Sequence, residues 1–253
     1  MLHFRKMGAG APLFIVHGLF GSSDNWQGLA KKYAEHYEVY LVDQRNHGHS
    51  FHSDEPFDYD VMALDLLALI EQEGLSGVSF IGHSMGGKSV MRLAQIRPDV
   101  VEKLVVADMG VKAYPPHHDK ILAGLNAVDL SILTKRKEVE EVIAQHVADF
   151  SVRMFLMKNL YWKEKGVLGW RINIPVLTRD ILNVVAAIPD VEVDVPALFI
   201  TGGSSNYVLE SDQEKLTALF PQIEFHVIEE VGHWLHAESP EEFYAKTISF
   251  LQH

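Results

Sequence analysis

Short strand-like runs alternate with amphipathic helical segments over the first 110 and the last 60 or so residues of the chain. The runs lie at 2–6, 12–16, 37–43, 78–81, 104–107, 197–201 and 223–228, and the helical segments at 22–36, 59–73, 88–97, 210–220 and 240–252. Continuous apolar runs are typical of strands buried on both faces of a parallel sheet, with helices as crossover connections. We therefore predict an α/β fold with a mostly parallel central sheet flanked by helices.

The pattern changes between about residues 111 and 190. Buried-strand runs disappear, and helical periodicity takes their place at about 119–126, 134–158 and 177–188. A helical stretch inside an alternating strand and helix pattern indicates an insertion that folds over the sheet. We expect a core domain from residues 1–110 and 191–253 and a helical cap, or lid, from residues 111–190.

One turn in the core has the form Gly-x-Ser-x-Gly, with Ser84 at its centre. The run at 78–81 precedes it and a helical segment follows it, so the serine lies at a sharp strand-to-helix turn. Gly82 and Gly86 lack a β-carbon, which lets the two backbones approach closely. This context predicts a nucleophile elbow that exposes the Ser84 hydroxyl.

A serine hydroxyl needs a general base and an orienting carboxylate. In a parallel sheet the site lies at the carboxyl ends of the strands. His233 follows the last predicted strand and is preceded by a glycine, so we assign it as the base, with His236 as the alternative.

The carboxylate is harder to place. The loop at 202–207, after the penultimate strand, contains no Asp or Glu. Asp108 ends the strand at 104–107 on the same edge of the sheet as Ser84, whereas Asp212 falls in the helix that follows the loop. We predict Asp108 as the acid, with Asp212 as a weaker alternative.

Two backbone amides should stabilise the oxyanion that forms on the substrate. Met85, directly after the serine, provides one. The loop after the strand at 12–16 provides the other, from Leu19 or, as second choice, Phe20. We expect Phe20, Trp26 and Trp234, together with aromatic residues of the cap, to form the walls of an apolar pocket for the acyl group of the substrate.

Composition excludes several other functions. The net charge of −12 argues against nucleic acid as a partner and disfavours binding to anionic membranes. There is no cysteine, hence no disulfide, thiolate metal site or cysteine nucleophile. The histidine pairs lack the spacing of metal ligands. No apolar run reaches the length of a signal-peptide core or a membrane span, so we expect a cytoplasmic protein without stable membrane insertion.

Taken together, four motifs resemble the α/β-hydrolase superfamily, and within it the small bacterial carboxylesterases of the YbfF type. They are residues 17–22, 43–50, 82–88 and 232–234, and the segments 45–48 and 170–176 are similar to that narrower group. The resemblance implies a Ser-His-Asp esterase with a helical lid, and it supports Asp108 as the acid. It also implies that Asp43 and Arg45 hold the loop beneath the site.

The predicted function is therefore a cofactor-independent serine hydrolase that cleaves carboxylic esters, or thioesters, of small molecules. The same triad could serve an acyl-CoA thioesterase, a carbon–carbon bond hydrolase or a lyase of the menaquinone-pathway type. A ligand-binding receptor with little turnover is a further alternative. Ser84 excludes relatives that need an aspartate nucleophile, and the sequence does not indicate an oligomeric state.

Overall fold

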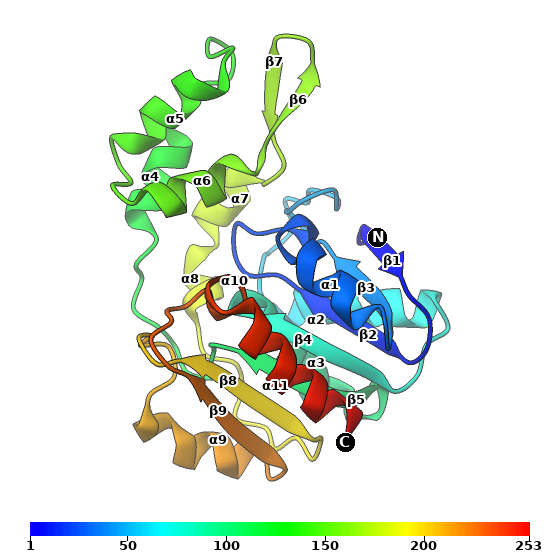
Figure 1. Ribbon diagram of the computed structural model, residues 1–253. Coiled ribbons are helices and arrows are strands. Elements are labelled where there is room, and N and C mark those ends of the chain that lie inside the picture. The colour runs from blue at the N-terminus through cyan, green and yellow to red at the C-terminus, as the bar shows by residue number, and fades with distance from the viewer.

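The central element of the protein is a seven-stranded sheet, seen in a computed structural model that describes residues 1–253 (Figure 1). Its strand order is β1-β3-β2-β4-β5-β8-β9, and only the edge strand β1 runs antiparallel to its neighbour. The strands are β1 (Phe4–Met7), β2 (Pro12–Val16), β3 (Glu38–Val42), β4 (Val78–His83), β5 (Val101–Ala107), β8 (Ala197–Gly202) and β9 (Ile223–Ile228). The predicted mostly parallel sheet is confirmed.

Helices cover both faces of this sheet, as the two-sided burial of its strands requires. One face carries α2 (Tyr59–Gln72), α3 (Met85–Ile96) and α9 (Gln213–Leu219). The other carries α1 (Gln27–Tyr33) and α11 (Pro240–Gln252), with α10 (Leu235–Glu238) just before α11. Short 3-10 helices occupy Ser23–Trp26, Pro98–Val100 and Glu210–Asp212.

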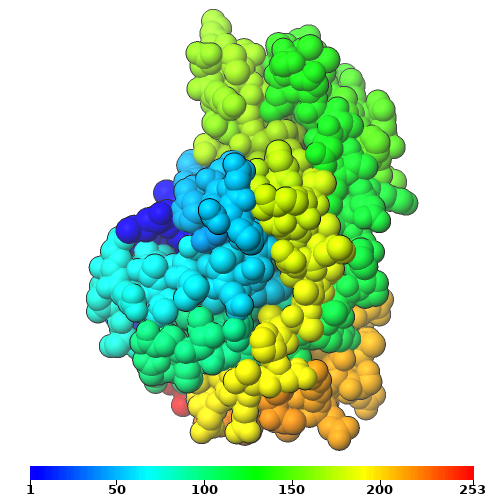
Figure 2. Space-filling view, turned by 180° about the vertical axis from the view of Figure 1, so that it is seen from behind, coloured from blue at the N-terminus to red at the C-terminus, as the bar shows by residue number.

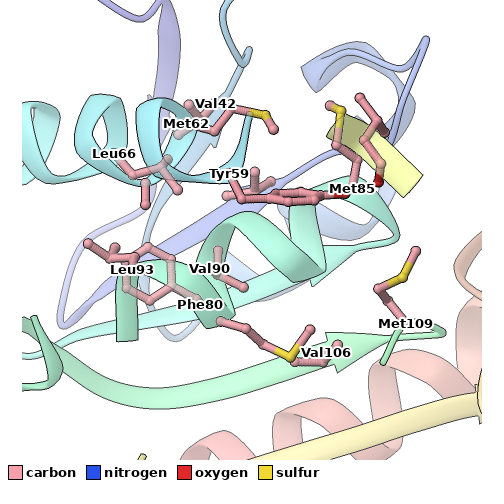
Figure 3. Packing of buried hydrophobic residues seen from close by; sticks show 14 of the residues in the cluster. Val42, Tyr59, Met62, Leu66, Phe80, Met85, Val90, Leu93, Val106 and Met109 are labelled. Carbon is pink, nitrogen blue, oxygen red and sulfur yellow. Dashed lines mark hydrogen bonds between the residues drawn. The ribbon is translucent and has the colours of Figure 1, made fainter. Parts of the chain in front are cut away.

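Apolar side chains from α2, α3 and the central strands interlock on the first face (Figure 3). Met62 and Leu66 of α2 meet Val90 and Leu93 of α3 above Phe80 of β4, and all five are almost completely buried. This packing fixes α3, the helix that begins directly after Ser84, against the sheet.

The segment 111–190, which we call the cap, stands beyond the carboxyl ends of the strands (Figure 1). It contains α4 (Asp119–Asn126), α5 (Arg136–Ala144), α6 (Phe150–Met157), β6 (Leu160–Glu164), β7 (Val167–Trp170), α7 (Ile174–Arg179) and α8 (Ile181–Val185). Strands β6 and β7 form an antiparallel hairpin. A purely helical insertion was therefore an incomplete prediction.

The reason for that difference is local. The predicted helix at 134–158 ends at Ala144, and α6 begins after the N-cap Asp149, whose side chain accepts a hydrogen bond from the Val152 amide at 3.0 Å. The hairpin has little apolar alternation, because Trp162, Lys163 and Glu164 are all exposed. Its strands therefore lack the pattern that identifies the buried strands of the core.

The cap is attached to the core along its returning segment, which runs beside the loop after β3 in the rear view (Figure 2). The Asn173 amide donates to the Asn46 carbonyl at 3.0 Å, and Asp180 accepts from the Phe57 amide at 2.9 Å. Where the cap leaves and rejoins the core, the Tyr114 amide donates to the Val185 carbonyl at 2.8 Å. These bonds hold the cap above the sheet edge.

Candidate active site

Ser84 lies between β4 and α3 in a backbone conformation that a residue with a β-carbon rarely adopts. Its φ is 53° and its ψ is −119°. Such a conformation costs on the order of 1–3 kcal/mol, and it persists only where the surrounding structure enforces it. The result is a half-buried serine that reaches a cavity while its neighbours Met85 and Gly86 are buried.

The two glycines of the motif are required by close backbone contacts. A β-carbon on Gly82 would lie 2.6 Å from the Gly86 carbonyl oxygen, and one on Gly86 would lie 2.3 Å from the Val16 carbonyl oxygen. Both distances are far shorter than a van der Waals contact. The glycines therefore let α3 approach β4 and β2 closely enough to hold the Ser84 turn, as the sequence motif predicts.

His233 and Asp108 meet behind the cavity, although they are far apart in the sequence. His233 Nδ1 lies 2.6 Å from Asp108 Oδ2, a short hydrogen bond in which the ring nitrogen donates. Asp108 is completely buried and follows β5 with a φ of 50°. This bond leaves His233 Nε2 as the nitrogen that can accept a proton.

Asp108 receives two further hydrogen bonds from the loop after β8. Ser205 Oγ donates to Asp108 Oδ2 at 2.5 Å, and the Gly202 amide donates to Oδ1 at 3.3 Å. The ring of Tyr207 stacks on the His233 imidazole, with ring centroids 3.9 Å apart. The loop at 202–207, which contains no Asp or Glu of its own, thus donates hydrogen bonds to the Asp108 carboxylate.

The two alternatives weighed for the triad occupy other positions. Asp212 pairs with Lys112, and no hydrogen bond connects it to a histidine. His236 is buried and stacks on Trp26 with ring centroids 4.1 Å apart, and burial lowers its pKa to about 3. His236 bonds neither to Ser84 nor to an acid, so the geometry favours His233 and Asp108.

A second histidine fixes the backbone of the first. His83 Nε2 lies 2.9 Å from the His233 carbonyl oxygen, so the ring nitrogen donates this bond. His83 is buried, and this burial holds its pKa well below the usual range. It therefore remains neutral and connects the strand before Ser84 to the loop that carries His233.

The loop after β2 presents the two amides considered from sequence, those of Leu19 and Phe20, in different states. The Phe20 amide donates to His47 Nε2 at 3.1 Å, while His47 Nδ1 donates to the Arg45 carbonyl at 3.0 Å. Burial lowers the His47 pKa to about 3, which keeps this neutral tautomer in place. The Leu19 amide has no hydrogen-bond acceptor within the protein. Of the two amides considered from sequence, only that of Leu19 is available.

The Met85 amide is the other amide predicted to stabilise the oxyanion. Met85 is the first residue of α3, so its amide has no acceptor within that helix. The positive end of the helix dipole adds to the attraction for a negative oxygen at this point. Leu19 and Met85 both border the space next to Ser84.

Asp43 and Arg45 lie beneath these loops and do not line the cavity. Asp43 accepts hydrogen bonds from the Ser23 amide at 2.7 Å and the His49 amide at 2.9 Å. Arg45 forms a two-pronged ion pair with Asp65, at 2.5 and 2.8 Å. Both contacts fit the bracing role that the resemblance implies.

The cavity above Ser84 has a volume of about 400 Å³ and lies between the core and the cap. It is lined by His233 and by the predicted pocket residues Phe20, Trp26 and Trp234, and Phe155 of the cap packs on Trp234. Trp26 is only 1% exposed, so it forms the wall from behind. No hydrogen bond joins Ser84 to His233, but both side chains face this one space.

Sequence reasoning missed several residues that shape the site. They are His47, His83, Ser205 and Tyr207, which position other groups, and Asn159 of the cap, whose side chain donates to the Phe20 carbonyl at 2.7 Å. The Ser205 hydroxyl offered a signal, because it falls in the loop where a carboxylate was sought. The others depend on contacts between distant segments.

Comparison with known proteins shows to which family the chain belongs. The sequence profile described as the Alpha/beta hydrolase family matches residues 13–246. The chain belongs to the α/β-hydrolase family. It is 40% identical to Esterase YbfF of Escherichia coli, over 91% of this chain and 89% of that protein. It is 36% identical to the sn-1-specific diacylglycerol lipase ABHD11 of Mus musculus, over 94% of this chain and 80% of that protein.

Solved structures give the same result. A marine microorganism esterase superposes with a TM-score of 0.95 at 41% identity, and the match covers 98% of each chain. The E-2-(acetamidomethylene)succinate hydrolase, at 20% identity and a TM-score of 0.82, shares the fold. The α/β-hydrolase fold and the resemblance to YbfF-type esterases are thus confirmed, and this chain is a hydrolase whose relatives include esterases and lipases.

No helix of this chain combines the length and the apolar character needed to cross a membrane. A cytoplasmic location stays a prediction, as does the division of the chain into core and cap domains.

Proposed function

We propose that this α/β-hydrolase cleaves carboxylic esters through an acyl-enzyme, with Ser84 as nucleophile, His233 as general base and Asp108 as orienting acid. The observation that carries the proposal is the 2.6 Å hydrogen bond between His233 Nδ1 and Asp108 Oδ2 behind a cavity that Ser84 enters. It fixes the tautomer in which Nε2 accepts the serine proton. The similarity to Esterase YbfF supports an ester as the substrate.

The steps follow from this arrangement. Ser84 Oγ attacks the acyl carbonyl while His233 Nε2 takes the hydroxyl proton, and the carbonyl oxygen becomes an oxyanion that accepts from the Leu19 and Met85 amides. The C–O bond to the alcohol then breaks as His233 returns the proton to the leaving oxygen. A water molecule, deprotonated by His233, then attacks the acyl carbon. The bond to Ser84 Oγ breaks as His233 returns the proton to that oxygen, and the acid is released. The nucleophile, the base and the two amide donors of these steps all belong to the chain itself.

The burial of Asp108 and the hydrogen bonds to both of its oxygens support its role as the acid that orients His233. It has no contact with the cavity, and His233, Ser205 and Gly202 donate to its two oxygens. Such a carboxylate stabilises the imidazolium that forms in the transition state and holds the ring in place. The Asp212 carboxylate, paired with Lys112, has no such contact.

The cavity favours an ester over an acyl-CoA thioester. No lysine or arginine lines it, whereas a CoA group carries phosphates that need cationic partners. The basic cluster at residues 135–137 is engaged within the cap. Arg136 donates to the Met157 and Leu160 carbonyls, and Lys135 and Lys137 form ion pairs with Glu138 and Glu141.

A covalent label tests the nucleophile. A fluorophosphonate probe should modify wild-type protein once, at Ser84, and abolish turnover of a short nitrophenyl ester. Ser84→Ala should neither react nor turn over, and Ser249→Ala, at an exposed serine on α11, should behave like the wild type. Labelling of Ser84→Ala at the wild-type rate would disprove the assignment.

A substrate panel tests the reaction class. Esters, acyl-CoA thioesters and vinylogous diketones of similar size should be compared by kcat/KM, and we expect the esters to be preferred. Preference for the diketones would indicate a carbon–carbon bond hydrolase. Turnover of none of these classes would leave the lyase or receptor alternatives.

A further inference from the structure

Two cavities of very different size meet at Ser84. The larger, of about 400 Å³, is bordered by His233, Trp234 and Phe155. The smaller, of about 20 Å³, runs under the cap junction between Met85 and Met109 and is bordered by Val184 and Val185. Ser84 lines both cavities, but His233 lines only the larger one.

The chemistry of ester cleavage determines on which side of Ser84 the alcohol and the acyl group of the substrate lie. When the tetrahedral intermediate collapses, His233 Nε2 must deliver a proton to the leaving alcohol oxygen, so that oxygen lies within hydrogen-bond reach of the ring. The oxyanion points at the Leu19 and Met85 amides. The remaining substituent of the carbonyl carbon, the acyl chain, must then point away from His233.

On the basis of the proposed ester hydrolysis, we infer that the small cavity receives the acyl group and the large cavity receives the alcohol. A site of this shape selects acetate-like esters of bulky apolar alcohols. The large apolar pocket predicted from sequence thus binds the alcohol, in place of the acyl chain.

The size of the small cavity sets the acyl length. A cavity of about 10–15 Å³ holds one water molecule. The small cavity has a volume of about 20 Å³. It therefore accommodates a group about as large as a methyl. A longer chain would have to displace side chains that are close-packed.

Specific bonds hold the walls of this cavity. The Tyr59 hydroxyl donates to the Val184 carbonyl at 2.6 Å, and the Tyr114 amide donates to the Val185 carbonyl at 2.8 Å. Lys88 Nζ lies over both tyrosine rings, 5.5 Å from the Tyr59 centroid and 4.8 Å from the Tyr114 centroid. In the close view, Tyr59 and Met85 lie next to one another above α3, and Met109 lies beyond the end of β5 (Figure 3).

A pair of isomeric substrates provides the test. Octyl acetate and ethyl octanoate contain the same atoms and differ only in which side of the ester carries the long chain. We expect kcat/KM for octyl acetate to exceed that for ethyl octanoate by roughly 100-fold or more, because a pocket discriminates by about 10-fold or more per excluded methylene. Equal values, or a preference for ethyl octanoate, would overturn the inference while leaving ester hydrolysis intact.

Two variants locate the effect. Met109→Ala should widen the small cavity and raise the ratio of ethyl octanoate to octyl acetate turnover about tenfold or more. Phe155→Ala, on the large cavity, should raise KM for octyl acetate and leave unchanged the ratio between nitrophenyl acetate and nitrophenyl octanoate. If Phe155→Ala changed that acyl ratio and Met109→Ala did not, the acyl chain would lie in the large cavity. If the wild type hydrolysed none of these esters, the proposed function itself would be refuted.

Discussion

Lys88 lies in the core one helical turn after Ser84, with its side-chain amine enclosed. Its side chain is completely buried, and its Nζ donates to the Lys112 carbonyl at 2.7 Å and to the Ala186 carbonyl. These carbonyls lie where the chain enters and leaves the cap. No carboxylate pairs with the amine, and burial lowers the pKa of Lys88 from 10.5 to about 7. The stability of the protein should therefore depend on the protonation of this one group.

The sign follows from proton linkage. Between pH 7 and pH 10.5 the unfolded chain binds a proton at Lys88 that the folded protein does not hold, so the free energy of unfolding rises with pH in this range. Below pH 7 both states are protonated and the contribution is constant. For these pKa values the gain between pH 6 and pH 10 is about 4 kcal/mol. This gain is an upper bound, because the two carbonyls and the two tyrosine rings around Nζ stabilise the charged form of Lys88 in the folded protein.

Comparison of wild type with Lys88→Met isolates the effect. Methionine has a similar shape, carries no charge and leaves two carbonyls without a donor, which costs about 1–3 kcal/mol each at every pH. Urea unfolding at pH 6, 8 and 10 should give a stability difference between the two proteins that grows in favour of the wild type by up to about 4 kcal/mol.

Lys103→Met is the matched control. Lys103 Nζ also donates to two carbonyls, those of Phe250 and Leu251, both at 3.1 Å, but its side chain is half-buried. Lys103→Met therefore removes two hydrogen bonds of the same kind from an amine that is not fully buried. Its effect on the free energy of unfolding shows what the loss of the bonds alone costs. A Lys88→Met difference that stayed constant within about 0.5 kcal/mol from pH 6 to pH 10 would refute the reasoning.

Three further predictions concern the site and its supports. Asp108→Asn should lower kcat about 10⁴-fold while Asp212→Asn stays near wild type, and the opposite result in steady-state assays would reassign the acid. Gly86→Ala places a β-carbon 2.3 Å from a backbone carbonyl oxygen, so little folded protein should be recovered, and a wild-type circular dichroism melt would contradict this. Because burial lowers the pKa values of His47 and His236 to about 3, unfolded chains take up protons below pH 6.5 that the folded protein excludes. Urea-derived stability should therefore fall from pH 6.5 towards pH 3, and a flat profile would show that these rings are accessible.

The sequence pattern was sufficient for the core because its signals are local. Buried parallel strands need continuous apolar runs, and the turn at Ser84 needs Gly82 and Gly86 on either side, so both can be recognised from neighbouring residues. The cap was predicted less completely. Its β6–β7 hairpin is largely exposed, and an exposed hairpin needs no regular alternation of apolar residues.

The sequence by itself determined the α/β fold and the sharp strand-to-helix turn at Ser84, and it proposed His233 and Asp108 from their places after strands. The tertiary structure decided which carboxylate contacts the histidine, and that the Phe20 amide is bonded to His47 while that of Leu19 is free. It also decided the unequal cavities beside Ser84. These features depend on distances between segments far apart in the chain. Such distances are set by how the cap and the loops pack together, which local patterns of residues do not encode.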